Sequence, residues 1–158
     1  MGQQWDIQGI SFGYKGHKVL FDQLSFSLAS GTFTGVAGPN GVGKTTLIHL
    51  LSGTLRPSAG KVMLDGQSVH RMSPSSLARR LAMVRQHSDM PFGFTVEETV
   101  LMARTAHLDW RGFETKVDRD RVHEALRLTE TEGLADRSIN SLSGGESHRV
   151  FIARALAQ

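Results

Sequence analysis

The glycine-rich stretch GPNGVGKT, residues 38–45, constrains this chain more than any other part of its sequence. It matches the pattern G-x-x-x-x-G-K-[ST], which requires a strand before it and a helix after it. The apolar run Phe33–Ala37 precedes the stretch, and Lys44–Leu51 has helical character. Glycines allow left-handed turns that bring backbone N–H groups close to phosphate oxygens. The stretch therefore predicts a nucleotide-binding loop; the alternative is a glycine-rich turn with a chance Lys-Thr.

Two side chains in this stretch have specific predicted roles. Lys44 is expected to reach the β and γ phosphates, and Thr45 to hold Mg²⁺ through its hydroxyl group. The helix that follows adds the unpaired N–H groups and the positive dipole of its first turn. We expect ATP and Mg²⁺ as cofactors. The predicted nucleotide-binding residues of the stretch are Gly38, Pro39, Asn40, Gly41, Val42, Gly43, Lys44, Thr45 and Thr46.

Composition narrows the remaining classes. A chain of 158 residues that is 39% hydrophobic can form one domain with its own core. It has no cysteine, which excludes disulfide scaffolds and thiolate metal sites. The net charge is only +3 and the arginines are scattered, so we expect no nucleic-acid partner. The polar start MGQQWDIQGI does not resemble a secretory leader, which favours a cytoplasmic protein.

Strands and helices alternate along the sequence, which predicts an α/β fold. Thr95 with Glu98 and Ser143 with Glu146 form capping-box patterns that mark two helix starts. Strands are expected at Asp6–Phe12, Val19–Leu28, Phe33–Ala37, Val62–Leu64 and Leu81–Arg85. Helices are expected at Lys44–Leu51, Pro74–Arg80, Thr95–Arg104, Glu114–Leu128 and Ser143–Leu156.

A second short string points to a particular family. The sequence LSGGE, residues 142–146, is similar to the signature motif of ATP-binding cassette (ABC) ATPases, which read LSGGQ or LSGGE. Physically, Ser143 caps a helix while Gly144 and Gly145 leave its first N–H groups open to an anion. Alone, the string is only a capped helix start. Together with the phosphate loop, it makes the chain resemble an ABC ATPase over essentially its whole length.

The resemblance implies further site residues. Tyr14 lies where the family places the aromatic ring that stacks on adenine. Gln86 lies where the family has its Q-loop glutamine, which implies a catalytic and Mg²⁺-binding role. Ser143, Gly144 and Gly145 are then expected to contact the ATP of a partner subunit.

The resemblance also implies an architecture. The P-loop NTPase cassette would have an N-terminal antiparallel β region, a parallel core at the phosphate loop and a helical subdomain that ends in the signature helix. We expect one partial ABC domain over residues 1–158. Residues of about 1–86 and 141–158 would form the nucleotide-binding core, and about 87–140 the helical subdomain.

Softer similarities point to cassettes that import iron chelates, haem or cobalamin. They lie in LARRL at 77–81, in FTVEETV at 94–100 and in LADR at 134–137. Such a subunit is expected to dimerise, closing on ATP and opening on hydrolysis. A transmembrane permease is expected to hold it at the cytoplasmic face of the membrane, and a substrate-binding protein to act indirectly.

The family continues beyond the signature helix into an apolar strand ending in Asp-Glu, and then to a switch histidine; neither follows here. We therefore expect a truncated cassette, with little or no hydrolysis by the 158 residues alone. The strand Phe33–Ala37 would also keep an open apolar flank.

Two other functions stay open at this point. One is a soluble ABC ATPase without a permease, although such proteins usually carry tandem cassettes or long coiled-coil insertions. The other is a nucleotide-binding fragment that does not hydrolyse ATP. A P-loop kinase leaves the LSGGE string unexplained.

Overall fold

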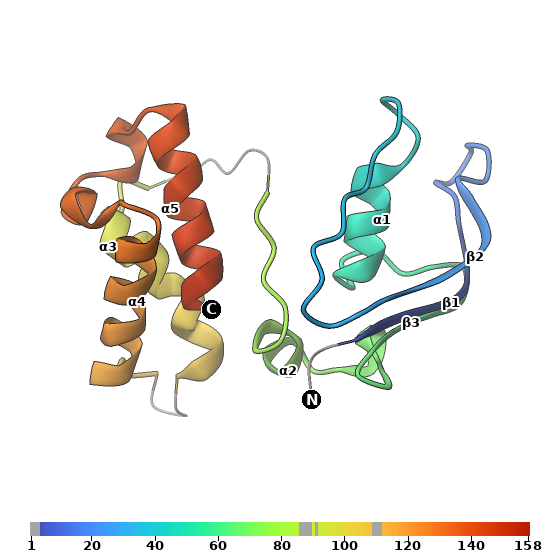
Figure 1. Cartoon of the computed structure of the whole chain (residues 1–158), viewed down its shortest axis with the longest axis horizontal. Coiled ribbons are helices and arrows are strands. Elements are labelled where there is room, and N and C mark those ends of the chain that lie inside the picture. The colour runs from blue at the N-terminus through green and yellow to red at the C-terminus, as the bar shows by residue number, and fades with distance from the viewer. Residues whose placement is uncertain (1–3, 86–89, 91, 109–111) are drawn as a thin grey trace. The chain divides into compact units, whose positions relative to one another are not determined.

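The computed structural model describes residues 4–85, 90, 92–108 and 112–158 (Figure 1). The chain forms two compact units, Met1–Ser73 and Pro74–Gln158. The first unit contains the predicted phosphate loop, and the second contains the predicted signature helix. None of the helices in the described ranges is both long and apolar enough to cross a membrane.

A four-stranded antiparallel sheet organises the first unit, with the strand order β2-β1-β3-β4. The strands are β1 (Trp5–Phe12), β2 (Phe21–Leu28), β3 (Ala59–Leu64) and the short β4 (Gln67–Ser68), followed by the 3₁₀ turn η1 (Val69–Arg71). The helix α1 (Lys44–Leu51) belongs to the same unit. This sheet is the antiparallel N-terminal region that the sequence predicts; β4 was not predicted.

The sheet has one buried face. The register of β1 shifts between Ile7 and Ile10, so both side chains are buried although they are three positions apart. Ile7, Ile10 and Phe12 of β1 are buried, and β2 alternates between exposed and half-buried positions from Leu24 to Leu28. Gly60 permits an unusually close approach of β3 to β1. Its φ is +80°, and a Cβ atom there would lie 2.3 Å from the carbonyl oxygen of Gly9.

Two predicted strands are wrong. Phe33–Ala37 and Leu81–Arg85 have no regular secondary structure, and Phe33 is fully exposed. A parallel strand exists only where neighbouring strands accept and donate its backbone hydrogen bonds, and no strand in the described part of the chain pairs with either segment. The carbonyl oxygen of Leu81 instead accepts a hydrogen bond from Gln158 Nε2, at 2.7 Å. The parallel part of the predicted core is therefore not formed here. β2 also starts later than predicted, at Phe21, and Val19 before it is exposed.

Helices make up the second unit. They are α2 (Pro74–Ala78), α3 (Val96–Leu101), α4 (Lys116–Leu128) and α5 (Gly144–Ala157). Three 3₁₀ segments lie between them: η2 (Met102–His107), η3 (Glu132–Leu134) and η4 (Ile139–Ser141). α5 packs with α3 and α4 in this unit. The finer division into a nucleotide-binding core and a helical subdomain stays a prediction.

Capping boxes set the starts of three helices. Those of Thr95 with Glu98 and of Ser143 with Glu146 are confirmed. A third, Thr115 with Asp118, was missed and starts α4 two residues later than predicted. The helix predicted to run to Arg104 is wrong in its last turn, since α3 gives way to 3₁₀ geometry at Met102. Tightening of the final turn is common at helix ends.

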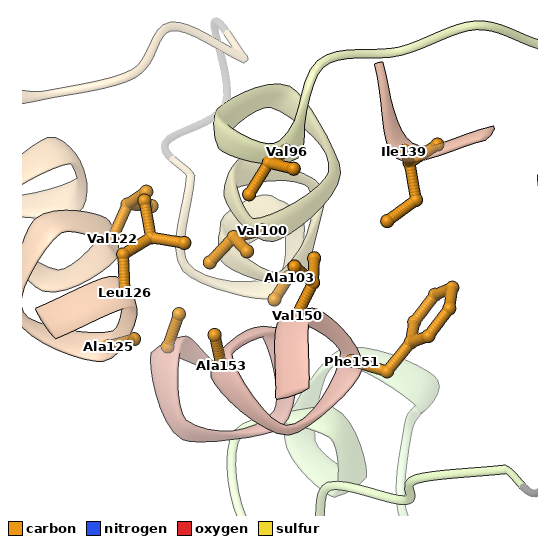
Figure 2. Packing of buried hydrophobic residues seen from close by; sticks show 11 residues of the cluster. Val96, Val100, Ala103, Val122, Ala125, Leu126, Ile139, Val150, Phe151 and Ala153 are labelled. Carbon is orange, nitrogen blue, oxygen red and sulfur yellow. The ribbon is translucent and has the colours of Figure 1, made fainter. Parts of the chain in front are cut away.

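Small and branched apolar side chains, together with one phenylalanine, form the core of the second unit (Figure 2). The predicted stripe of Val122, Ala125 and Leu126 on α4 is buried. It packs with residues of α3, η2, η4 and α5, which are Val96, Val100, Ala103, Ile139, Val150, Phe151, Ala153 and Ala157. Tertiary packing of this kind supplies most of the stability of short helices.

Leu126 tests this core against a matched neighbour. Leu126 is fully buried, whereas Leu128 on the same helix is 58% exposed. We expect Leu126→Ala to lower the free energy of unfolding by about 2–5 kcal/mol, through lost burial and the cavity left behind. Leu128→Ala should change it by less than about 0.5 kcal/mol. Urea denaturation followed by circular dichroism measures both, and equal losses would contradict the packing described here.

Candidate functional site

The phosphate stretch turns sharply just before α1. Gly41 and Gly43 have φ angles of +82° and +104°, a region that L side chains rarely adopt. Gly43 is also crowded, because a Cβ atom there would lie 2.8 Å from Leu20 Cδ2 and 2.9 Å from Phe21 Cζ. The φ angle favours glycine at this position, and any side chain there would also displace the ends of the Leu20 and Phe21 side chains. Leu20 and Phe21 are thus supporting residues that the sequence alone did not single out.

The backbone amides at the start of α1 are available to a ligand. Gly43 is the N-cap residue and offers no side-chain hydrogen bond. Among the residues that the structure describes, no acceptor is recorded for the N–H groups of Gly43, Lys44 and Thr45. Converging amide donors at a helix N-terminus form a site for phosphate. The backbone geometry thus leaves donors open where the phosphate loop is predicted, and phosphate binding by them stays a prediction.

Lys44 lies over this loop. Its Nζ atom donates hydrogen bonds of 2.7 Å to the carbonyl oxygens of Gly38 and Pro39. These contacts hold the ammonium group at the loop, on the exposed side of the chain. An ammonium group beside open amides fits the oxygens of a polyphosphate. The reach of Lys44 to the β and γ phosphates stays a prediction.

The chemistry of the loop also fits Mg²⁺ bound together with a nucleotide. No cluster of three or more His, Asp or Glu side chains that would hold a metal ion occurs in the described ranges. Mg²⁺ commonly takes few protein ligands and several phosphate or water oxygens. Thr45, exposed at the first turn of α1, would supply a hydroxyl ligand beside those phosphate oxygens.

Tyr14 lies near the same turn of α1. Its hydroxyl oxygen is 3.2 Å from Thr46 Oγ1, within hydrogen-bonding distance. The ring of Phe12 packs edge-to-face against the Tyr14 ring, with the centroids 5.1 Å apart. The Tyr14 side chain is nevertheless 48% exposed, which leaves ring surface available for stacking. The structure thus brings Tyr14 next to the phosphate stretch, and its stacking on adenine stays a prediction.

The predicted signature residues start α5. Ser143 is the N-cap, and its N–H and hydroxyl groups donate to Glu146 Oε2 at 2.8 and 2.7 Å. These two hydrogen bonds lower the pKa of the Glu146 carboxyl group. In the described part of the chain, the N–H groups of Gly144 and Gly145 have no recorded acceptor. The open amides fit the predicted anion contact, whereas the Ser143 hydroxyl is already engaged within the helix.

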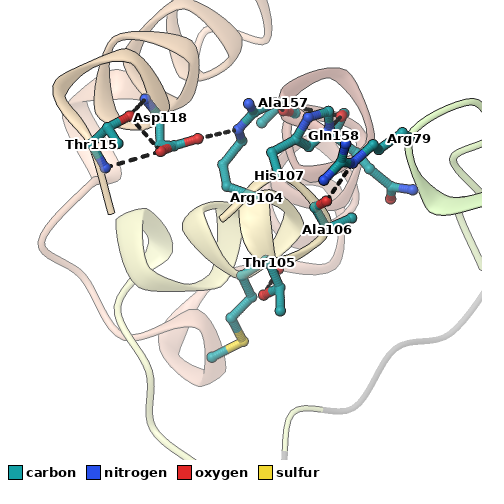
Figure 3. Close-up of polar contacts among 10 residues, drawn as sticks. Arg79, Arg104, Thr105, Ala106, His107, Thr115, Asp118, Ala157 and Gln158 are labelled. Atoms are coloured by element: carbon teal, nitrogen blue, oxygen red, sulfur yellow. Dashed lines mark hydrogen bonds and ion pairs between the residues drawn. The ribbon is translucent and has the colours of Figure 1, made fainter. Parts of the chain in front are cut away.

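A buried ion pair ties the other end of α5 to its neighbours (Figure 3). Arg104 Nε donates to Asp118 Oδ1 at 3.0 Å, and Arg104 Nη1 donates to the carbonyl oxygen of Ala157 at 2.7 Å. The Arg104 side chain therefore links η2, the first turn of α4 and the last turn of α5. This network was not predicted from the sequence. Only the T-x-x-D spacing of Thr115 and Asp118 signalled part of it.

Gln86 lies outside the described residues. Its predicted catalytic and Mg²⁺-binding roles stay predictions.

Comparison with known proteins gives the family. The model of the family described as "ABC transporter" matches residues 21–158. The chain belongs to the ABC transporter family. The predicted ABC cassette fold is confirmed by this match and by solved structures. A nucleotide-free ATP-binding cassette of an ABC transporter superposes with a TM-score of 0.80 at 26% identity, over 98% of this chain and 65% of that one. A chain of a bacterial Atm1-family ABC exporter with ATP bound also gives a TM-score of 0.80 at 26% identity, over 99% of this chain and 28% of the exporter chain.

Curated relatives are import ATP-binding proteins. The hemin import ATP-binding protein HmuV of Pseudomonas entomophila is 42% identical over 97% of this chain and 58% of its own length. The cobalamin import ATP-binding protein BtuD of Halobacterium salinarum is 40% identical over 97% of this chain and 38% of its length. The achromobactin transport ATP-binding protein CbrD of Dickeya dadantii is 38% identical over 94% and 55%. The chain thus spans between 38% and 58% of these relatives.

The ion pair of Arg104 and Asp118 predicts that the folded state loses stability in acid. Hydrogen bonds from the Thr115 hydroxyl and N–H, with Arg104 adding to them, lower the pKa of Asp118 from 3.8 to about 2. Because the pKa is lowered on folding, the stabilisation is complete above about pH 4 and is lost as the pH falls through about 2. One pKa unit corresponds to about 1.4 kcal/mol, so the contribution is about 2 kcal/mol.

We expect Asp118→Asn to remove this contribution. Between pH 5 and pH 2.5 the free energy of unfolding of the variant should fall less than that of the wild type, measured by urea denaturation. Asp120→Asn, on an exposed position of the same helix, should keep the wild-type pH dependence. If Asp118→Asn keeps the full acid-dependent loss, the pair does not stabilise the folded state in this way.

Proposed function

We propose that this chain is the ATP-binding part of an importer that takes up iron chelates, haem or cobalamin. The observation that carries the proposal is the uncapped start of α1. The helices α3, α4 and α5 each begin with a side-chain capping box, whereas α1 begins at Gly43 with no side-chain cap. The open amides, the Lys44 ammonium group and the half-exposed Tyr14 ring together suit a nucleotide triphosphate.

The cargo class rests on the relatives. Those reported above are named for hemin, cobalamin and achromobactin. The solved exporter and the nucleotide-free cassette superpose on this chain with the same TM-score of 0.80. The fold by itself therefore does not distinguish an importer from an exporter. It is the sequence similarity to import proteins that favours import.

Partners and location follow from the same proposal. Two such subunits would associate so that Ser143, Gly144 and Gly145 of one face the nucleotide on the phosphate loop of the other. A transmembrane permease would bind the pair at the cytoplasmic face of the membrane and would receive substrate from a binding protein. ATP binding would close the dimer, and hydrolysis would reopen it. Membership of the ABC transporter family supports ATP hydrolysis as the activity of the protein.

Lys44 provides the direct test of nucleotide binding. In the intact protein, a fluorescent ATP analogue with Mg²⁺ should bind saturably, and ATP should displace it. Lys44→Ala should weaken binding by about ten- to a hundredfold, because charge-assisted hydrogen bonds to phosphate are lost. The control is Lys61→Ala, which removes an exposed lysine of β3 and should leave the affinity unchanged. Absence of saturable binding to the folded wild-type protein would overturn the proposed function.

A further inference from the structure

The side chains of Tyr14 and Thr46 meet although they are 32 positions apart in the sequence. Tyr14 follows β1, where its carbonyl oxygen accepts a hydrogen bond of 2.9 Å from the His17 N–H group. Thr46 lies in the first turn of α1, directly after the two residues that the phosphate pattern specifies. Their oxygens are 3.2 Å apart. This contact joins the turn that presents the aromatic ring to the helix that starts at the phosphate loop.

The two partners differ in exposure. Thr46 is 8% exposed, so its hydroxyl lies largely away from water. Tyr14 is 48% exposed, and only part of its ring is covered. Phe12 contacts the ring with an interplanar angle of 85°, while Thr46 contacts the phenol oxygen. Two contacts, one on the ring and one at its tip, restrict the orientation of a side chain that would otherwise rotate freely.

We propose that Thr46 is a positioning residue for Tyr14, and that its hydroxyl holds the ring where an adenine base stacks. The proposal rests on the proposed function. It assigns the Thr46 hydroxyl to the base and leaves the phosphates to the amides of Gly43, Lys44 and Thr45 and to the Lys44 ammonium group. Fixing a binding group before the ligand arrives strengthens binding, because less conformational freedom is lost on association.

The division of roles predicts a difference between two ligands. Mg·ATP carries both a base and phosphates, whereas Mg·tripolyphosphate carries only phosphates. A hydroxyl that acts through the Tyr14 ring affects the first ligand alone. A hydroxyl that contacts phosphate directly affects both ligands alike.

Thr46→Val removes the hydroxyl and keeps the branched shape, while Thr46→Ser keeps the hydroxyl. We expect Thr46→Val to weaken Mg·ATP binding by about two- to tenfold, the range for one neutral hydrogen bond. Mg·tripolyphosphate binding should be unchanged, and Thr46→Ser should restore the ATP affinity. Isothermal titration calorimetry on the intact protein measures all three. Equal weakening of both ligands, or no weakening of either, overturns the proposal.

A double-mutant cycle isolates the Tyr14–Thr46 contact. Tyr14→Phe keeps the stacking ring and should weaken Mg·ATP as much as Thr46→Val does. In the Tyr14→Phe background, Thr46→Val should then have no further effect, because the hydrogen bond is already absent. Additive losses would show that the two hydroxyls act separately and would overturn the proposal.

A spectroscopic readout does not depend on nucleotide at all. Tyr14 is the only tyrosine among the 158 residues. In fluorine NMR of the fluorotyrosine-labelled protein, the Tyr14 resonance is assigned by its loss in Tyr14→Phe. Without ligand, Thr46→Val should shift and narrow this resonance as the ring gains freedom, and Thr46→Ser should resemble the wild type. An unchanged resonance in folded Thr46→Val overturns the positioning role. Failure of the wild type to bind either ligand would instead overturn the proposed function.

Discussion

The proposed nucleotide-binding function of this chain depends on the open N-terminus of α1. Helix starts leave backbone N–H groups without partners, and the other helices with assigned capping boxes satisfy some of them with Thr95, Thr115 or Ser143. At α1 the position is held by Gly43, whose φ angle of +104° is one that L side chains rarely adopt. The donors at this helix start are therefore left for a ligand, and Lys44 adds a positive charge beside them.

The second unit has a helix start of a different kind, at α5. The first turn of α5 is capped by Ser143 and Glu146, yet its two glycine amides stay open. A ligand there meets a helix start that is already ordered, and the far end of the same helix is held by Arg104. Burial of the Arg104–Asp118 pair makes this anchor firm only while Asp118 is ionised, because breaking one partner of a buried pair is costly. The cap and the Arg104 contact thus order α5 at its opposite ends, and an anion contact of its glycine amides stays a proposal.

Local signals in the sequence predicted local structure well. Three kinds of feature depend on residues within a few positions of one another: the phosphate stretch, two capping boxes and the buried stripe on α4. Such patterns can be recognised in the sequence. The strands Phe33–Ala37 and Leu81–Arg85 were wrong for the opposite reason, since a strand depends on partners far away in the chain. The Tyr14–Thr46 and Arg104–Asp118 contacts could not be predicted either, because they form only when separate elements pack. Gln86 lies outside the described residues, so its site was not tested.

The most direct measurement is amide NMR of the isotope-labelled intact protein during titration with Mg·ATP. If the open helix start is the phosphate cradle, the amide resonances of Gly43, Lys44 and Thr45 shift together and saturate with the binding isotherm. The amides in the first turns of the capped helices α3 and α4 stay in place. Saturating shifts elsewhere, with these three amides unmoved, would contradict the account.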